Sequence, residues 1–461
     1  MNSDQPDFHL STADRRRFSV ALKKLLPIDS IIDDADRLVV YESDALNAHR
    51  EIPWIVVLPD SISQVQEIMK LCSEYQVPVV ARGAGTGLSG GAMPSSDGIV
   101  LGLAKFNSIL AIDRDNLTAR VEPGVTNLAV SDHVRPLGLY YAPDPSSQIA
   151  CTIGGNIAEN AGGVHCLKYG LTVHNVLQLK VVTPSGELIT IGSTALDSSG
   201  YDLLATMIGS EGMLGVVVEV TVKLLPIPQT AKLVMAAFKS VVEAGDAVSA
   251  IISRGIIPAG LEMMDRMATK AVEEFVQVGY PLDAAAVLLC EVDGGVDEVD
   301  GHTEILTELL QKQGAYRVRV AQDEQERQEL WRGRKSAFSA VGRISPDYLC
   351  MDGTIPRHRL GQVLEEISDL AESYRLQVAN VFHAGDGNLH PLILYDANKA
   401  DELRRAMQLG AEILELCVAR GGTITGEHGV GIEKIDQMCV QFTEAEIAQF
   451  HQLKASFDPQ G

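Results

Sequence analysis

Residues 82–91, Arg-Gly-Ala-Gly-Thr-Gly-Leu-Ser-Gly-Gly, carry more information about the fold than any other stretch of this chain. They follow an apolar segment, 77–81, that predicts a strand, and residues 85–90 match the pattern G-x-G-x-x-G. A dinucleotide-binding helix should begin there, but Gly-Ala-Met-Pro follows at 91–94, which is typical of a loop. We therefore expect no Rossmann fold. The alternatives are a flexible surface loop and a backbone nest for diphosphate oxygens.

Two further glycine clusters favour the nest. The first covers residues 151–163 and includes Ile-Gly-Gly-Asn at 153–156, and the second is Gly-Ser-Glu-Gly-Met-Leu-Gly at 209–215. Glycines that recur through roughly 180 residues indicate one extended ligand, about the size of a dinucleotide.

The overall composition excludes several classes of protein. The 461 residues contain 38 Lys and Arg against 61 Asp and Glu, a formal net charge of −23, so we expect no nucleic acid partner and no attraction to an anionic lipid surface. No apolar run is long enough for a transmembrane helix, and no signal peptide is visible. Seven scattered cysteines without a C-x-x-C pair predict reduced thiols and a cytoplasmic protein.

The second half contains a candidate metal site. His383 and His390 flank a glycine turn, and Glu427 and His428 lie in a second glycine-rich stretch. Two imidazoles and a carboxylate suit Zn²⁺, Mn²⁺ or Fe²⁺ with a position open for substrate. Neighbouring side chains diverge in an extended stretch, so we expect Glu427 on the metal and His428 on the substrate. For Asp386 the preferred interpretation is a turn residue.

Arg334 is the candidate anion-binding residue among the basic side chains of the segment 331–335. Its planar guanidinium fits a carboxylate. The other basic residues there are expected to be solvated or ion-paired at the surface.

The first half resembles the FAD-binding domain of the vanillyl-alcohol oxidase and p-cresol methylhydroxylase superfamily. The motifs that carry the resemblance lie at 53–65, 82–91, 153–163 and 209–215. The resemblance implies that FAD is lined by Arg82, Gly83, Ala84, Gly85, Thr86, Gly87, Gly90, Thr152, Gly154, Gly155, Asn156, Gly162, Glu211, Gly212 and Val217. Some members link FAD to a histidine; for His165 a structural role is the preferred interpretation.

The second half resembles the C-terminal domain of FAD-linked oxidases that act on 2-hydroxy acids, through His-Ala-Gly-Asp-Gly-Asn-Leu-His at 383–390 and Gly-Glu-His-Gly-Val-Gly at 426–431. The resemblance implies three roles, namely a divalent metal on His383, His390 and Glu427, a catalytic base in His428, and substrate contacts from Arg334 and Asn388.

Residues 333–356 are most similar to the FAD-linked D subunits of bacterial glycolate oxidases. Phe338 and Cys350 stand where relatives specific for 2-hydroxyglutarate have Thr and Lys. This difference favours a substrate with one carboxylate.

The expected fold class is α+β, with a two-part FAD-binding domain of the p-cresol methylhydroxylase type, an α+β substrate domain with an antiparallel sheet, and a helical C-terminal segment. Residues 231–320 predict the order strand, helix, helix, strand, helix, strand. The expected divisions are a helical segment at 1–50, the FAD-binding domain at 51–228, the substrate domain at 229–415, and a C-terminal segment at 416–461 that returns to the flavin.

The expected function is FAD-dependent oxidation of glycolate to glyoxylate or of D-lactate to pyruvate, with D-2-hydroxyglutarate as an alternative substrate. The resemblance implies a second flavin-type subunit and an iron–sulfur subunit as partners. These would feed the quinone pool and hold the chain at the inner face of the cell membrane. The metal ligands alone also suit a metal-dependent hydrolase. A third possibility, an FAD-containing subunit without activity, is disfavoured because the four residues of the candidate metal site are intact.

Overall fold

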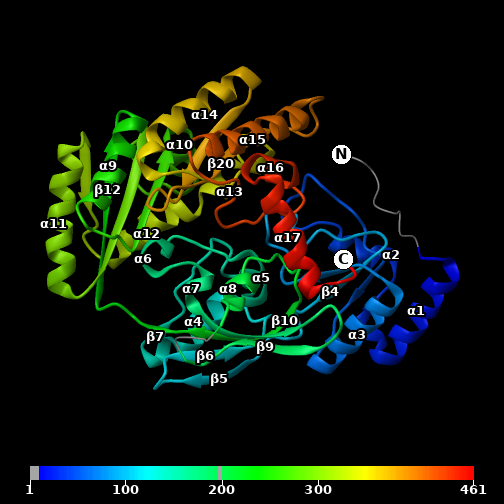
Figure 1. The fold of residues 1–461 in the computed structure, drawn as a ribbon. Helices are drawn as coiled ribbons and strands as arrows, with labels where there is room; N and C mark the ends of the chain where they lie inside the picture. Colours follow the sequence, from blue (N-terminus) through cyan, green and yellow to red (C-terminus); the bar gives the residue numbers. More distant parts are fainter. Residues whose placement is uncertain (1–9, 196–199) are drawn as a thin grey trace.

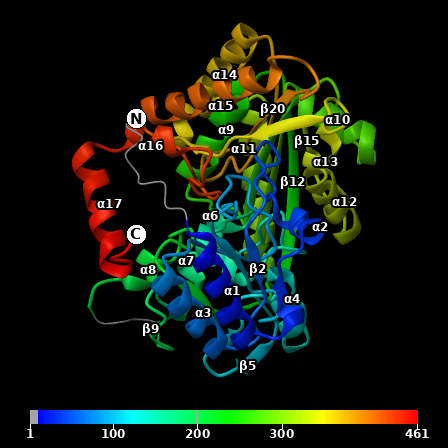
Figure 2. The same ribbon diagram turned by 90° about the vertical axis from the view of Figure 1, so that its right-hand side faces the viewer.

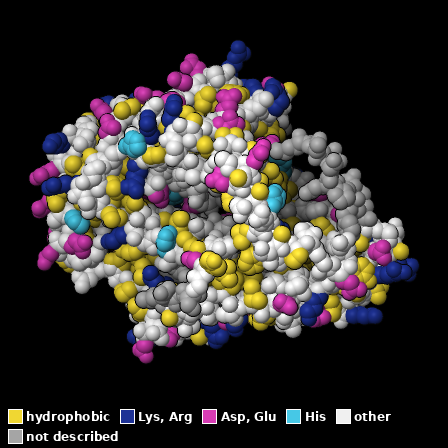
Figure 3. Space-filling view, in the orientation of Figure 1, with side chains coloured by type: hydrophobic (Ala, Val, Ile, Leu, Met, Phe, Trp, Pro, Cys, Tyr) yellow, Lys and Arg dark blue, Asp and Glu magenta, His cyan; other side chains and the backbone are white. Residues whose placement is uncertain are grey.

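The computed structural model describes residues 10–195 and 200–461. The first half of the chain, coloured blue to green, forms the lower and right part of the molecule in Figure 1, and the second half lies above it and to the left. The basic and acidic side chains are interspersed over the face drawn in Figure 3. Within the described residues no helix has both the length and the apolar character of a membrane span.

The first sheet has the strand order β1-β2-β4-β3, in which β4 pairs in parallel with β2 and β3 while β1 is antiparallel to β2. Its strands and the helical elements beside it are α1 Thr12–Leu25, η1 Ile28–Ser30, β1 Ile31–Ile32, α2 Ala35–Leu38, η2 Val39–Tyr41, β2 Ile55–Val57, α3 Ile62–Tyr75, β3 Val79–Arg82 and β4 Ile99–Gly102. Helix α3 buries Val65, Ile68 and Cys72 at helical spacing against this sheet. The chain runs from β3 to β4 without a helix, as expected for residues 83–98.

The second sheet is antiparallel, with the order β5-β6-β10-β8-β9. The elements of this part are β5 Ile109–Asp113, β6 Thr118–Val121, α4 Asn127–Val134, η3 Arg135–Leu137, β7 Leu139–Tyr140, α5 Ile153–Glu159, α6 Cys166–Tyr169, α7 Thr172–Asn175, β8 Val176–Val182, β9 Leu188–Gly192, α8 Leu203–Met207, β10 Val216–Lys223 and β11 Leu225–Pro226. Together the two sheets form the two-part architecture expected for the first half.

The third sheet has seven strands in the order β15-β12-β14-β13-β18-β20-β16, and every neighbouring pair is antiparallel. Its elements are β12 Thr230–Phe238, α9 Val241–Ser253, β13 Gly260–Asp265, α10 Arg266–Val276, β14 Ala286–Gly294, α11 Val296–Lys312, β15 Arg317–Val320, α12 Glu324–Lys335, α13 Ala337–Val341, β16 Asp347–Cys350, α14 Leu360–Tyr374, β18 Gln377–Phe382, β20 Pro391–Tyr395 and α15 Glu402–Ala419. Helices α9, α11, α14 and α15 cover one face, and α10, α12 and α13 cover the other.

Strand β13 was not predicted. The sequence indicated two consecutive helices after β12, whereas the structure inserts residues 260–265, Gly-Leu-Glu-Met-Met-Asp, between them as a strand. Glycine and acidic residues are depleted in strands, so local propensity argued against this segment. The strand nevertheless pairs with β14 on one side and β18 on the other, and it places Glu262 in the interior of the sheet.

The C-terminal segment returns to the first half of the chain. Its remaining elements and the short strands beside it are β17 Gly353–Thr354, η4 Arg357–Arg359, β19 Asn388–Leu389, α16 Ile435–Gln441 and α17 Glu444–Phe457. The Ile432 amide donates to the Ser89 carbonyl oxygen at 3.0 Å, and Lys454 Nζ donates to the Met213 carbonyl oxygen at 2.8 Å. Figure 2 shows α17 along the outer edge of the molecule. These contacts bring the stretch 426–431 onto the glycine loop of the first half.

Candidate active site

One cavity of about 420 Å³ is lined by both halves of the chain. The predicted flavin residues on its wall are Arg82, Gly83, Ala84, Gly85, Thr86, Gly87, Thr152, Gly154, Gly155, Asn156, Glu211, Gly212 and Val217. The second half contributes Arg334, His390, Glu427 and His428. The cavity has the size of an ordinary ligand site, and both predicted clusters open into it.

Gly90 and Gly162 lie outside this wall. A Cβ on Gly90 would approach Ile432 to 2.5 Å, and a Cβ on Gly162 would approach Glu427 Oε2 to 2.3 Å. Both glycines therefore allow close contact between the first half and the C-terminal stretch.

The glycine loop forms a cradle of backbone. A Cβ on Gly83 would lie 2.3 Å from Thr152 Oγ1, and Gly85 has a positive φ of +68°. Thr152 Oγ1 in turn accepts a hydrogen bond from the Gly155 amide at 3.3 Å, so the side chain that Gly83 approaches also caps the second glycine cluster. Three glycine clusters thus expose backbone without side chains to the cavity. This arrangement fits a dinucleotide whose diphosphate oxygens accept hydrogen bonds from backbone N–H groups.

The side chain of Arg82 connects the cradle to the N-terminal segment. Its Nη2 donates to the Ser43 carbonyl oxygen at 2.8 Å, and the guanidinium lies over the Tyr41 ring, 5.7 Å from its centroid. Burial lowers the pKa of Arg82, while the charge of Asp44 acts in the opposite direction.

The structure brings His383, His390 and Glu427 together. Glu427 Oε1 lies 3.3 Å from His383 Nε2 and 3.1 Å from His390 Nε2. The two histidines converge because His383 directly follows β18 and pairs with Asn388 across the turn, while His390 precedes β20 in the same hairpin. Sequence spacing predicted this convergence on the condition of two flanking strands, and the hairpin meets that condition.

Each imidazole also has an oxygen acceptor at Nδ1. His383 Nδ1 is 2.7 Å from Glu262 Oε1, and His390 Nδ1 is 3.4 Å from the Met351 carbonyl oxygen. With the proton on Nδ1, each Nε2 points a lone pair at Glu427 Oε1. Three electron-pair donors that face one another fit a divalent cation held by two oriented histidines and a carboxylate.

Glu262 connects this centre to the cation Arg334. Its Oε2 lies 2.6 Å from Arg334 Nη2, and both side chains are almost fully buried. Burial alone would raise the pKa of Glu262, but the charges of His383 and Arg334 outweigh it and hold the pKa below its usual value. Sequence reasoning missed Glu262 because its strand was missed; a lone carboxylate within an apolar segment is the signal that could have found it.

Asp352 shapes the loop that carries Glu427 and His428, and it too was missed. Its Oδ2 accepts hydrogen bonds from the Gly426 and His428 amides, both at 2.9 Å, and Lys434 Nζ lies 3.3 Å away. Burial would raise the pKa of Asp352, but the charges of His428 and Lys434 hold it well below its ordinary value. Asp352 therefore stays ionised and fixes the turn by charge-assisted hydrogen bonds.

His428 lies beside this centre on the cavity wall. Its ring stacks on His390 with centroids 4.9 Å apart, and its Nε2 lies 3.9 Å from Glu427 Oε1. The Nδ1 atom is buried and has no hydrogen-bond partner among the described residues. Burial lowers the pKa of His428 to about 4, so the ring is neutral near pH 7. Glu427 and His428 approach the same imidazole, so their side chains diverge less than the sequence suggested.

The remaining candidate residues are placed as follows. Arg334 is on the cavity wall, and its Nε has no hydrogen-bond partner among the described residues. Asn388 does not line the cavity; its side chain packs where a Cβ of Gly426 would lie. Asp386 accepts a hydrogen bond from the Asn388 amide at 3.3 Å, as a turn residue does.

His165 lies at a different cavity, of about 690 Å³, between the two halves. Its Nδ1 is 2.7 Å from Asp144 Oδ2, and its Nε2 is 3.2 Å from Glu291 Oε1. This position agrees with the structural role preferred for His165.

Solved structures share the fold of this chain. The chain superposes on p-cresol methylhydroxylase with a TM-score of 0.83 at 18% identity, over 98% of this chain and 96% of that one. It superposes on 4-ethylphenol oxidase from Gulosibacter chungangensis with a TM-score of 0.81 at 15% identity, over 99% and 97%. The fold is thus the FAD-binding fold of the p-cresol methylhydroxylase type, as predicted.

Sequence families make the assignment more specific. Residues 53–192 match the FAD binding domain family, and residues 227–461 match the family described as FAD linked oxidases, C-terminal domain. The chain belongs to the FAD-linked oxidases and is an FAD-dependent oxidoreductase. This membership leaves no support for the hydrolase that the metal ligands alone would allow.

Curated relatives narrow the comparison further. The glycolate oxidase subunit GlcD of Escherichia coli strain K12 is 58% identical over 455 residues, which is 99% of this chain and 91% of the relative. The subunit of the same name from Bacillus subtilis is 42% identical, over 92% and 91% of the two chains. A D-lactate dehydrogenase from Anaerostipes hadrus is 31% identical, over 95% and 93%.

Proposed function

We propose that this chain oxidises a small 2-hydroxy acid, either glycolate to glyoxylate or D-lactate to pyruvate. The observation that carries the proposal is the single cavity whose wall contains both the glycine cradle and the side chains of His390, Glu427, His428 and Arg334. The names of the relatives at 58% and 31% identity agree with these two substrates.

FAD is assigned to the cradle and a divalent metal, Zn²⁺, Mn²⁺ or Fe²⁺, to His383, His390 and Glu427. When bound, FAD supplies the hydride acceptor, and the metal supplies a Lewis acid that makes the substrate hydroxyl more acidic. The fifteen predicted flavin residues stay assigned to FAD, with Gly90 and Gly162 placed one layer behind the wall.

His428 is the proposed catalytic base, and Nε2 is its acceptor atom. Nδ1 is buried and has no hydrogen-bond partner in the described part of the chain, which leaves Nε2, on the side of Glu427, to face the substrate. The neutral ring then carries its proton on Nδ1 and takes the proton of the substrate hydroxyl at Nε2. The stack on His390 orients the ring, and the hydrogen bond that the His428 backbone N–H donates to Asp352 Oδ2 fixes the backbone that carries it.

Arg334 is the proposed partner of the substrate carboxylate. One edge of its guanidinium is held by Glu262, and Nε is buried without a hydrogen-bond partner among the described residues. Asn388 stays a proposed substrate contact, although its side chain does not line the cavity in this structure. Removal of the flat guanidinium should weaken binding of every 2-hydroxy acid, because all carry this carboxylate.

The cavity wall suits a substrate with one carboxylate. Phe338 lines it with an aromatic ring, and the neighbouring Cys350 is uncharged and buried. Lys335 also reaches the wall, but its side chain is exposed. Among the described wall residues, the second half of the chain therefore contributes Arg334 as its one buried cation, and the other buried cation, Arg82, belongs to the flavin cradle.

An anaerobic panel of 2-hydroxy acids tests the proposal. The flavin-loaded protein is mixed with glycolate, D-lactate or D-2-hydroxyglutarate, before and after treatment with a chelator, and the visible flavin absorbance is followed. We expect bleaching by glycolate or D-lactate, slow bleaching by D-2-hydroxyglutarate, and a lower rate after chelation. A flavin that none of the three acids bleaches contradicts the proposed reaction, and equal rates before and after chelation contradict the metal.

The reduced flavin must pass its electrons on. We propose a second flavin-type subunit and an iron–sulfur subunit as partners that feed quinone and hold the chain at the inner, cytoplasmic face of the cell membrane. The proposed division of the chain is a helical segment at 1–50, the FAD-binding domain at 51–228, the substrate domain at 229–415 and a C-terminal segment at 416–461. Purified alone, it should reduce artificial dyes faster than O₂, and rapid peroxide production would argue against these partners.

A further inference from the structure

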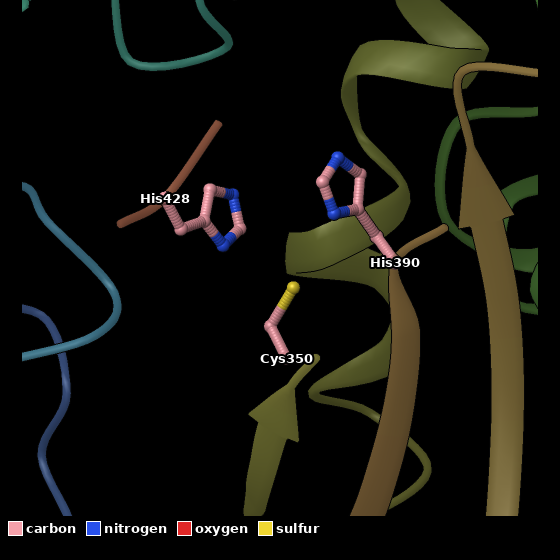
Figure 4. A group of neighbouring side chains, drawn as sticks. All are labelled: Cys350, His390 and His428. Carbon is pink, nitrogen blue, oxygen red and sulfur yellow. The ribbon is translucent and has the colours of Figure 1, made fainter. Parts of the chain in front are cut away.

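Cys350, His390 and His428 form a second group of donors beside the proposed catalytic centre. One ligand atom of each lies within 4.8 Å of the others. Figure 4 shows the Cys350 thiol pointing into the space between the two imidazole rings. The strands place these side chains together, because Cys350 ends β16, which pairs with β20 directly after His390.

This group shares only His390 with the set His383, His390 and Glu427. Its donor atoms are also weakly engaged. His428 Nδ1 has no hydrogen-bond partner among the described residues, and Cys350 Sγ donates a long hydrogen bond of 3.6 Å to the Met351 carbonyl oxygen. Buried polar atoms are ordinarily satisfied, so a free Nδ1 next to a thiol indicates capacity for a ligand.

The two sets differ in chemical softness. A thiolate with two imidazoles is typical of ions such as Zn²⁺ and Cd²⁺, whereas two imidazoles with a carboxylate also accept Mn²⁺ and Fe²⁺. An ion can reach the thiol from the cavity, because His390 and His428 lie on its wall and Cys350 lies just behind them.

We propose that Cys350, His390 and His428 bind a thiophilic divalent ion and that this ion inhibits the enzyme. On binding, the Cys350 thiol loses its proton to solvent and forms a sulfur–metal bond. The ion also takes the Nδ1 atoms of His390 and His428, so the proton that each ring carries there moves to its Nε2. The inhibitory half of the proposal rests on the proposed function, because His428 Nε2 is then protonated and cannot accept the substrate proton.

Cadmium titration tests the site without reference to activity. The flavin-loaded Cys439→Ser protein is used as the parent, because Cys439 is the exposed cysteine of the chain. We expect one equivalent of Cd²⁺ to produce the ultraviolet charge-transfer absorption of a cadmium–thiolate bond. In this parent Cys350→Ser should abolish that absorption, and the matched change of another buried thiol, Cys417→Ser, should keep it.

Two more variants separate the sets. Glu427→Gln removes a donor of the first set only, so the absorption should persist, whereas His428→Gln should weaken it. Absence of the absorption in the parent, its survival in Cys350→Ser, or its loss in Glu427→Gln would overturn the proposal. Thermal unfolding of each variant shows whether a lost signal comes from a lost site or from a lost fold.

The inhibitory half is read from flavin reduction by the substrate. Cd²⁺ should inhibit the Cys439→Ser parent, and Cys350→Ser should raise the half-inhibitory concentration by on the order of tenfold, because a hard hydroxyl replaces a soft thiolate. Equal inhibition of both proteins overturns this half. A protein that shows the cadmium–thiolate absorption but bleaches with no 2-hydroxy acid retains the metal site and contradicts the proposed function instead.

Discussion

The glycine cradle and the His–His–Glu centre face one cavity but are built in opposite ways. The cradle is backbone, and side chains are excluded from it; a single Cβ on Gly83 would lie 2.3 Å from Thr152 Oγ1. The centre is made of buried side chains, each held by another from a distant segment. Glu262 holds His383 across 121 residues, and Asp352 holds the His428 amide across 76.

The comparison teaches which kind of site tolerates which change. A backbone cradle loses its ligand when a side chain is added, whereas a side-chain centre loses its function when a side chain is removed. We expect changes in the cradle to affect flavin affinity and changes in the centre to affect rate and stability. The first three predictions below test that division, and a last one tests a contact that belongs to neither region; they are given in order of decreasing effect.

The largest effect is expected from His428→Gln. Without a base at Nε2, substrate oxidation should slow about 10²–10⁴-fold. The flavin spectrum should stay as in the wild type, because the cradle is untouched. Dye reduction per bound flavin measures the rate, and His451→Gln, on the exposed face of α17, is the matched control. If the His428→Gln protein turned over at the wild-type rate, the assignment of His428 as the catalytic base would be wrong.

Glu262→Gln should destabilise the fold strongly. It leaves the buried charge of Arg334 without its carboxylate, and breaking a buried ion pair in this way costs about 3–5 kcal/mol. The free energy of unfolding in urea measures the change. The exposed Glu308→Gln on α11 should stay within about 0.5 kcal/mol of the wild type. If both variants unfold alike, Glu262 does not hold the centre together.

Gly83→Ala should weaken flavin binding but leave the centre intact. The new methyl group overlaps Thr152 Oγ1, and such overpacking costs about 1–3 kcal/mol. The dissociation constant of FAD should therefore rise about 5–150-fold. Gly301→Ala adds the same methyl on helix α11, where no atom lies within 4 Å, and should leave FAD affinity unchanged. Unaltered affinity in Gly83→Ala would show that this glycine is not part of the cradle.

The smallest effect concerns the contact between the halves at His165. Burial would lower the pKa of His165, but Asp144 and Glu291 outweigh it and raise the pKa well above its usual value. A raised pKa adds stability that is complete below about pH 6.5 and is lost as the pH rises through the folded-state pKa. The unfolding free energy should fall more steeply above neutral pH in the wild type than in His165→Gln.

The acid side of the same contact has the opposite sign. Burial would raise the pKa of Glu291, but His165 and Arg327 lower it to about 2. That stability is present above about pH 4.3 and is lost as the pH falls toward 2. Urea unfolding at several pH values, with His451→Gln as control, measures the loss of stability at high pH and the loss at low pH. Parallel pH profiles for the wild type and His165→Gln would show that this contact contributes nothing.

The two regions also differ in how far the sequence predicted them. The cradle could be predicted because its glycines are clustered in the sequence and indicate a local backbone conformation. The sequence predicted no helix after 82–91, and the structure has none there. The convergence of His383 and His390 was found because one hairpin creates it. Glu262 and Asp352 were missed because their role exists only after distant segments pack together. The sequence also could not predict that Gly90 and Gly162 lie outside the cavity wall, because this depends on the C-terminal stretch that packs against them.

The central claim is that substrate oxidised at the side-chain centre reduces the flavin bound in the backbone cradle. Anaerobic mixing of flavin-saturated protein with glycolate or D-lactate, followed at the visible flavin absorbance, tests it directly when wild type and Glu427→Gln are compared at equal flavin content. We predict bleaching of the wild type and a loss of bleaching in Glu427→Gln, whose cradle residues are unchanged. Equal bleaching of the two proteins, or none in the wild type, would contradict the account.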